Sequence, residues 1–130
     1  MTCLADLALE VLQTPDPAAK AFLTRKAAAA WLSGQAADIG RATPPDRLAR
    51  PARPVLMPPR EMPRRSKAGL RGRIALLHAL AHIELNAIDL AWDIIARFTG
   101  LGLPRGFYDD WVQVALDEAE HFDALADMLT

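Results

Sequence analysis

Residues 76–93 read LLHALAHIELNAIDLAWD, and residues 107–122 read FYDDWVQVALDEAEHF. In both stretches apolar residues recur every three or four positions, which is the spacing of one face of an α-helix. We therefore predict two long helices, over about residues 70–98 and 106–128, with Gly100 in the loop between them. The side chains that interrupt these two apolar faces are the ones that carry chemistry.

A single carboxylate interrupts the apolar stripe of the first predicted long helix. Glu84 lies in the middle of that stripe, whose other members are Leu77, Leu80, Ala81, Ile88, Ala91 and Ile95. Most polar residues of this helix fall on its other faces, namely His78, His82, Asn86, Asp89 and Asp93. A buried carboxylate without a partner is heavily penalised, so buried acids are generally paired or bound to a metal.

The second long helix repeats this pattern with two polar residues, Glu118 and His121. They share a stripe with Trp111, Val114, Ala115, Phe122, Leu125 and Met128. A solvated face is predicted on the opposite side, at Asp110, Gln113, Asp117, Glu120 and Asp127. The Glu-x-x-His spacing places both side chains on one face, one turn apart, so that both can reach one ion.

Glu84, Glu118 and His121 together match half of the ligand set of a di-iron four-helix bundle. A carboxylate can bridge two metal ions, and imidazole supplies a neutral nitrogen that suits iron or manganese. The competing interpretation is that the Glu-x-x-His spacing arises by chance and that Glu84 snorkels or pairs with an arginine. The occurrence of all three residues in mid-stripe positions on consecutive helices favours the metal site.

Other candidate residues have simpler explanations. His78 and His82 have a spacing that could bind zinc, but the intervening residues lack the HExxH pattern of helical metalloproteases. We expect them to support the site, lie at the surface or form interhelical hydrogen bonds. Tyr108 and Trp111 could be redox neighbours of a metal, although aromatic residues at helical spacing are more often core.

We predict two further segments in the sequence that precedes the helical pair of residues 70–130. Residues 1–40 form an N-terminal helical segment, with helices over 3–12 and from an N-cap at Thr14 to about residue 32. Residues 41–69 contain seven of the ten prolines, interleaved with arginines. Proline removes backbone donors and biases the preceding residue toward extended conformations, so an extended, polyproline-like strap is expected there.

Composition and charge limit the fold class, the partners and the cellular location that we expect. The 130 residues suit one domain, and the apolar runs are dominated by Ala and Leu, which favours an all-α fold. Residues 41–73 hold ten of the fifteen Lys and Arg residues, which could contact an anionic partner such as RNA or the acidic faces of the long helices. Cys3 is the single cysteine, no stretch of the sequence resembles a signal peptide, and no window of about eighteen apolar residues is free of charge. We therefore expect a cytoplasmic protein without a membrane span.

The two helical motifs together resemble an uncharacterised bacterial family of ferritin-like proteins. TPDPAAKAFL at residues 14–23 and RPARPVLMPPREMPRR at residues 50–65 also fit its N-terminal pattern, so the resemblance covers nearly the whole chain. It implies a ferritin-like helical bundle and a di-metal centre with Glu84, Glu118 and His121 as ligands, but no established reaction. Family members continue with two further long helices bearing another Glu and another Glu-x-x-His, whereas this sequence stops at Thr130.

Two classes of function follow from these patterns. The first is a di-metal carboxylate protein, with iron or alternatively manganese, that activates O₂ to oxidise a small molecule or oxidises iron itself. Its site would be completed by a homodimer or by a missing C-terminal half. A related bundle hydroxylates a modified tRNA base, which makes a nucleic acid substrate conceivable by fold-level analogy alone. The second class is a non-enzymatic helical interaction or dimerisation module, or a truncated half of a larger protein without a complete metal site.

Overall fold

The computed structural model describes residues 3–44 and 69–129, which form helices and loops without a strand. The helices are α1 (Leu4–Leu12), α2 (Pro17–Leu32), α3 (Gly69–Arg97) and α4 (Arg105–Leu129). The predicted all-α class is confirmed, and each predicted helix is found with ends close to those expected. The predicted proline-rich strap falls mostly outside the described residues.

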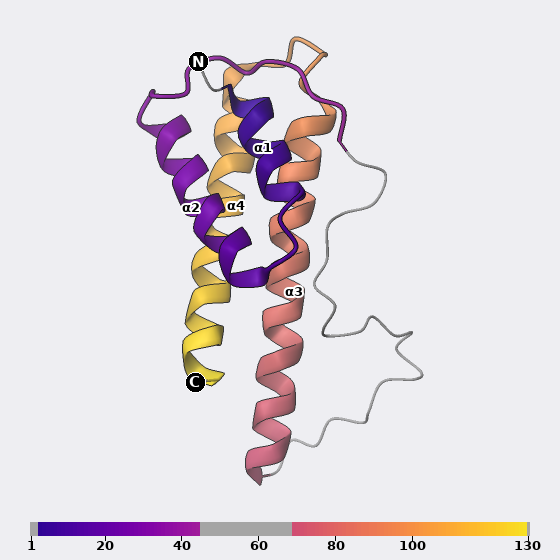
Figure 1. Ribbon diagram of the computed structural model, residues 1–130, viewed down its shortest axis with the longest axis vertical. Coiled ribbons are helices and arrows are strands. Elements are labelled where there is room, and N and C mark those ends of the chain that lie inside the picture. Colours follow the sequence, from indigo (N-terminus) through magenta and orange to yellow (C-terminus); the bar gives the residue numbers. More distant parts are fainter. Residues whose placement is uncertain (1–2, 45–68, 130) are drawn as a thin grey trace.

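The helices form two antiparallel hairpins stacked on each other (Figure 1). α3 and α4 make the long hairpin, and α1 and α2 lie across one of its faces, with α1 against α3 and α2 against α4. The N-terminal end of α3 extends past the other helices. Within the described part of the chain, helices therefore cover one face of the long hairpin and leave its other face open.

Small and aromatic side chains share the core between the two hairpins. Alanines buried on every helix, such as Ala8, Ala28, Ala91 and Ala115, allow the helix axes to approach closely. The largest buried side chains, Trp31, Trp92 and Tyr108, fill the space that remains. Burial of large aromatic groups contributes much of the hydrophobic stabilisation of such a core.

The start of α2 differs from the prediction of Thr14 as its N-cap. Asp16 is the N-cap, because its Oδ2 accepts a hydrogen bond from the backbone N of Ala19 at 2.9 Å, and Pro17 follows as the first helical residue. The Thr14 hydroxyl instead donates to the carbonyl of Glu10 at 2.7 Å, at the end of α1. Both residues are good capping types and each is followed by a proline, so the local sequence does not decide between them.

A short backbone contact anchors the first turn of α1. The backbone N–H groups of Leu4 and Ala5 donate to the carbonyls of Asp38 and Ile39, at 2.8 and 2.9 Å. These bonds satisfy donors that have no partner within a helix. Gly40 then turns away with a φ of +73°, where a Cβ would lie 2.3 Å from Sγ of Cys3. This position therefore requires glycine for both conformation and space.

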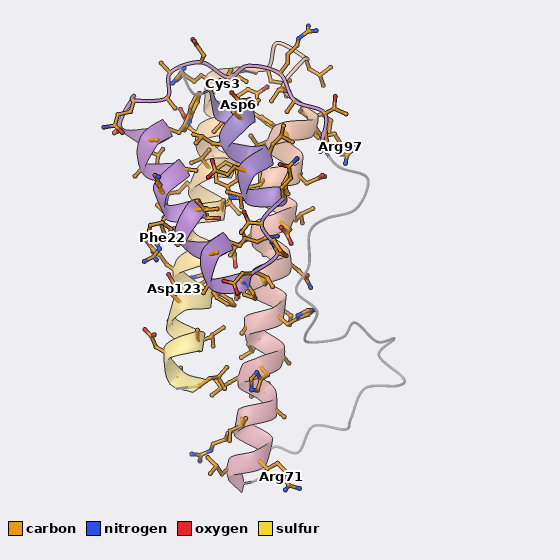
Figure 2. The ribbon with its side chains drawn as sticks, in the orientation of Figure 1. Cys3, Asp6, Phe22, Arg71, Arg97 and Asp123 are labelled. Carbon is orange, nitrogen blue, oxygen red and sulfur yellow. The ribbon has the colours of Figure 1, made fainter. Side chains whose placement is uncertain are left out.

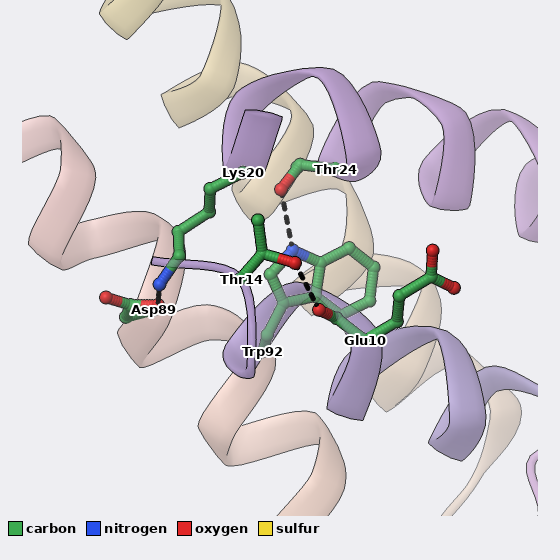
Figure 3. A network of polar contacts seen from close by, with 6 residues as sticks. All are labelled: Glu10, Thr14, Lys20, Thr24, Asp89 and Trp92. Carbon is green, nitrogen blue, oxygen red and sulfur yellow. Dashed lines mark hydrogen bonds and ion pairs between the residues drawn. The ribbon is translucent and has the colours of Figure 1, made fainter. Parts of the chain in front are cut away.

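A buried polar network joins α2 to α3 (Figure 3). The Lys20 ammonium pairs with Oδ1 of Asp89, and Nε1 of Trp92 donates to Oγ1 of Thr24 at 3.1 Å. The sequence places Asp89 off the apolar stripe, among most of the polar residues of its helix, yet its side chain is fully buried. α2 covers that side of α3 and supplies Lys20, so Asp89 is inside the molecule.

α3 is also the described helix that is long and apolar enough, by length and composition, to cross a membrane. Its most apolar window has a mean hydropathy of 1.4, and 28% of that window is buried inside the protein. Core helices of proteins that never enter a membrane meet the same two criteria, so this is weak support for a membrane span.

Candidate metal centre

The antiparallel packing of α3 and α4 brings the three predicted ligands together. Glu84 is on α3, and Glu118 and His121 are one turn apart on α4. One ligand atom from each residue lies within 4.8 Å of the others. Nδ1 of His121 is 3.6 Å from Oε2 of Glu84 and 3.6 Å from Oε2 of Glu118. The imidazole thus faces both carboxylates.

The cluster lies at the boundary between the core and the open face of the long hairpin. The side chains of Glu84 and Glu118 are 20% and 24% exposed, whereas that of His121 is 60% exposed. The prediction that His121 lies within the buried stripe of its helix is therefore wrong. The buried residues of α4 are instead Tyr108, Val112, Ala115, Ala119 and Phe122, of which the predicted stripe contained Ala115 and Phe122.

The positions of the three ligand atoms suit coordination of a metal ion better than hydrogen bonding among the three side chains. Oε2 of Glu84 is buried and has no hydrogen-bond partner among the described residues. Its 3.6 Å separation from Nδ1 of His121 is too long for a good hydrogen bond. Two ligand atoms that are each about 2.1 Å from one ion stand roughly 3.0 Å apart in octahedral geometry and roughly 3.4 Å apart in tetrahedral geometry, so the observed spacing is slightly wider than an ion needs. An ion would satisfy the buried oxygen.

The electrostatics of the cluster also favour a cation. Two carboxylates brought together in a partly buried place repel each other unless a positive charge lies between them. Within residues 3–44 and 69–129, the ion-pair partner found for both Glu84 and Glu118 is His121, and no Lys or Arg contacts either carboxylate. The interpretation that Glu84 is neutralised by an arginine therefore has no support in the described part of the chain.

The neighbouring Asp123 belongs to a different contact. Asp123 lies on the part of α4 beside α2 (Figure 2). Its Oδ2 is 3.3 Å from Nε of Arg25 in a partly exposed ion pair. Asp123 and His121 are two positions apart on α4, so their side chains point to different sides of the helix. Arg25 therefore neutralises Asp123 on the side of α4 that faces α2. It does not neutralise Glu84 or Glu118 in the candidate metal centre.

A protein family described as "Protein of unknown function (DUF455)" matches residues 13–130. The chain belongs to the DUF455 family. An uncharacterised protein of Haemophilus influenzae is 40% identical to it over 98 residues, which are 71% of this chain and 34% of that protein. This DUF455 chain thus spans about a third of the length of the curated relative that it matches. No solved structure matches it.

The other candidate residues of this DUF455 chain lie outside the cluster. His78 is exposed and His82 is half-buried, and neither is grouped with the three candidate ligands. Tyr108 is buried and donates from its hydroxyl to the carbonyl of Phe98 at 2.7 Å. Burial raises the pKa of the Tyr108 phenol. The core interpretation of Tyr108 is confirmed, and Trp111 packs half-buried against the same core.

Sequence reasoning missed the buried pair of Lys20 and Asp89, which holds the N-terminal hairpin against the helix that carries Glu84. A signal for it exists in retrospect. Lys20 stands alone among apolar residues in the first turns of α2, and Asp89 stands between Ile88 and Leu90. Two isolated opposite charges in apolar surroundings are candidates for pairing, but the sequence does not show which elements meet.

Proposed function

We propose that this chain forms the metal-binding half of a ferritin-like di-metal carboxylate protein. The observation that carries the proposal is the convergence of Glu84, Glu118 and His121, whose ligand atoms lie within 4.8 Å of one another. Ferritin-like di-metal proteins use a Glu from each of two helices and a Glu-x-x-His from each of two others. One Glu and one Glu-x-x-His on an antiparallel helix pair are half of that set.

Oxygen and imidazole donors suit iron first and manganese as the alternative. Glu118 and Glu84 supply negative charge that offsets that of the cations, and His121 supplies a neutral nitrogen through Nδ1, the ring atom nearest both carboxylates. When bound, a di-iron centre supplies O₂-dependent oxidation, either of a small organic substrate or of iron. The protein's own contribution is to hold the donors on rigid helices beside an apolar core.

The complete centre needs a second set of ligands, because three protein donors are too few for two ions. Those ligands come either from a second copy of this chain or from further helices of a longer protein. We place the protein in the cytoplasm, where a lone thiol such as Cys3 stays reduced. Most of the basic residues that could contact RNA lie outside the described residues, and a nucleic acid substrate rests on fold-level analogy alone.

A second candidate function is a helical interaction module that binds no metal. The 60% exposure of His121 favours it, because a metal ligand is normally held more firmly than an exposed side chain. In that case the cluster is an ion pair at the edge of a surface that another helix covers.

Metal binding by matched variants distinguishes the two candidates. Titration of the purified chain with Fe(II) under anaerobic conditions, or with Mn(II), should show saturable binding. Glu118→Ala should lose at least about tenfold in affinity, as expected when an anionic ligand is removed. Glu120→Ala is the matched control, because Glu120 is an exposed carboxylate on the same helix. Equal binding by both variants, or none by the parent chain, would favour the interaction module.

A further inference from the structure

α3 carries a second apolar stripe, distinct from the one that packs against α4. It consists of Leu76, Leu80, Ile83, Ala87, Leu90 and Ile94, which we call the outer seam. Its leucines and Ile83 are between 36% and 57% exposed, and Ala87 and Ile94 are half-buried. The buried residues of α3 that face the other described helices, such as Leu85, Ile88 and Trp92, lie on a different side. The outer seam has no covering element among the described helices.

The spacing of the outer seam is that of a helix that pairs with another helix. Its members alternate four and three residues apart, which is the heptad repeat of a coiled coil. Scattered exposed apolar residues are ordinary on a protein surface, but a continuous stripe marks an interaction site. From residue 76 to residue 94 the seam runs about 27 Å along the helix, at about 1.5 Å per residue.

The outer seam is centred on the candidate metal centre. Its midpoint, halfway between residues 76 and 94, is residue 85, and Glu84 is adjacent to it. Glu84 also follows Ile83 directly, so the carboxylate borders the seam. On α4 the exposed side chains of Val114, His121 and Met128 lie at helical spacing and continue the open face past the cluster.

We propose that a second copy of this chain docks on the outer seam with its α3 antiparallel to the first. A two-fold axis through the seam midpoint pairs Leu76 with Ile94 of the second copy and Ile83 with Ala87 of the second copy. The same axis sets Glu84 opposite Asn86 of the second copy, so the two Glu84 residues are only about 3 Å apart along the helix direction. Symmetric pairing of one surface with itself is the commonest mode of oligomerisation, and here the axis passes beside Glu84 of the candidate half-site.

Docking of this kind explains three features together. It covers the exposed seam from Leu76 to Ile94. It also shields His121 from solvent. Finally, resting on the proposed function, it joins two half-sites into two Glu and two Glu-x-x-His ligand groups, which is the full set of a di-metal bundle.

Sedimentation equilibrium of the whole chain, with chelator and with Fe(II), tests the docking surface. We expect a dimer in both conditions. Ile83→Glu and Leu90→Glu each place a charge within the seam and should raise the dimer dissociation constant at least about tenfold, equivalent to about 1.4 kcal/mol. Leu101→Glu is the control, because Leu101 is 64% exposed but lies outside the seam. A monomeric parent chain at every concentration, with or without metal, would overturn the proposal and assign the seam to another segment of a longer protein.

Disulfide trapping tests the antiparallel direction. In a Cys3→Ser background, a mixture of Leu76→Cys and Ile94→Cys chains should form a covalent heterodimer on mild oxidation. Each variant alone should stay uncrosslinked, because identical positions lie far apart in an antiparallel pair. Crosslinking of each variant with itself would show a parallel pair and contradict the geometry. A dimer that passes both tests but binds no metal would remove the proposed function and leave the docking surface intact.

Discussion

Lys20 on α2 and Asp89 on α3 form an ion pair inside the protein, with side chains that are 1% and 0% exposed. The pair joins the N-terminal hairpin to the helix that carries Glu84. Removal of two charges from water is costly, and their mutual attraction in the interior offsets that cost only while both are present. The pair therefore makes the seating of α2 on α3 sensitive to either residue.

Asp89→Ala should lower the free energy of unfolding by about 3–5 kcal/mol, because it leaves the Lys20 ammonium in the interior without this carboxylate. Chemical denaturation followed by circular dichroism measures the change. Asp93→Ala is the matched control on the same helix, since the Asp93–Arg97 pair is largely exposed and should contribute below about 1 kcal/mol. A double change, Lys20→Met with Asp89→Leu, should recover most of the loss. An equal loss in the double variant would show that the packing, and not the charge, is responsible.

The Tyr108 phenol should titrate above its ordinary pKa of 10.0, because burial disfavours the phenolate. The native state then holds this proton more tightly than the unfolded state. Stability from this group is therefore fully present below pH 10.0 and is lost as the pH rises through the native pKa.

Tyr108 is the single tyrosine of the chain, so the ultraviolet absorbance of tyrosinate reports it directly. The absorbance change in native protein should occur at higher pH than in protein unfolded by denaturant. Coincident titration curves for the two states would contradict the buried position of Tyr108 and its hydrogen bond to the carbonyl of Phe98.

Glu84→Leu should stabilise the metal-free protein by about 1 kcal/mol, since it removes a buried carboxylate oxygen without a hydrogen-bond partner and relieves repulsion with Glu118. The same change should abolish any rise in melting temperature caused by Fe(II) or Mn(II), because ligand binding stabilises only a protein that binds. Thermal unfolding with and without metal provides both readings. If Glu84→Leu instead destabilises the metal-free chain, the Glu84–His121 contact is a structural ion pair.

Much of the fold can be predicted from local patterns. The two long helices, and the exposed acidic face of α4 at Asp110, Asp117 and Glu120, follow from apolar periodicity and are confirmed. The start of α2 was displaced from Thr14 to Asp16 because both are good N-caps and a proline follows each of them. Periodicity identifies a helix more reliably than it identifies which of two adjacent capping residues begins it.

The burial of the candidate ligands is harder to predict from the sequence than their identity. Helical spacing alone places Glu118 and His121 on one side of α4, and the structure places them near Glu84. The burial of His121 depends on which face the neighbouring helices cover, and that is a property of tertiary packing. The same reason explains Asp89, which becomes a core residue because α2 brings Lys20 over it.

Metal content per chain, measured on protein of known mass in solution, tests the central claim most directly. The purified chain is loaded with Fe(II) under anaerobic conditions, freed of unbound metal and examined by elemental analysis, with its mass determined by light scattering. We predict close to one iron per chain in a dimer, which corresponds to one di-metal centre built from two copies of Glu84, Glu118 and His121. A well-folded chain that retains no iron, and no manganese in a parallel loading, would contradict the metal-binding account.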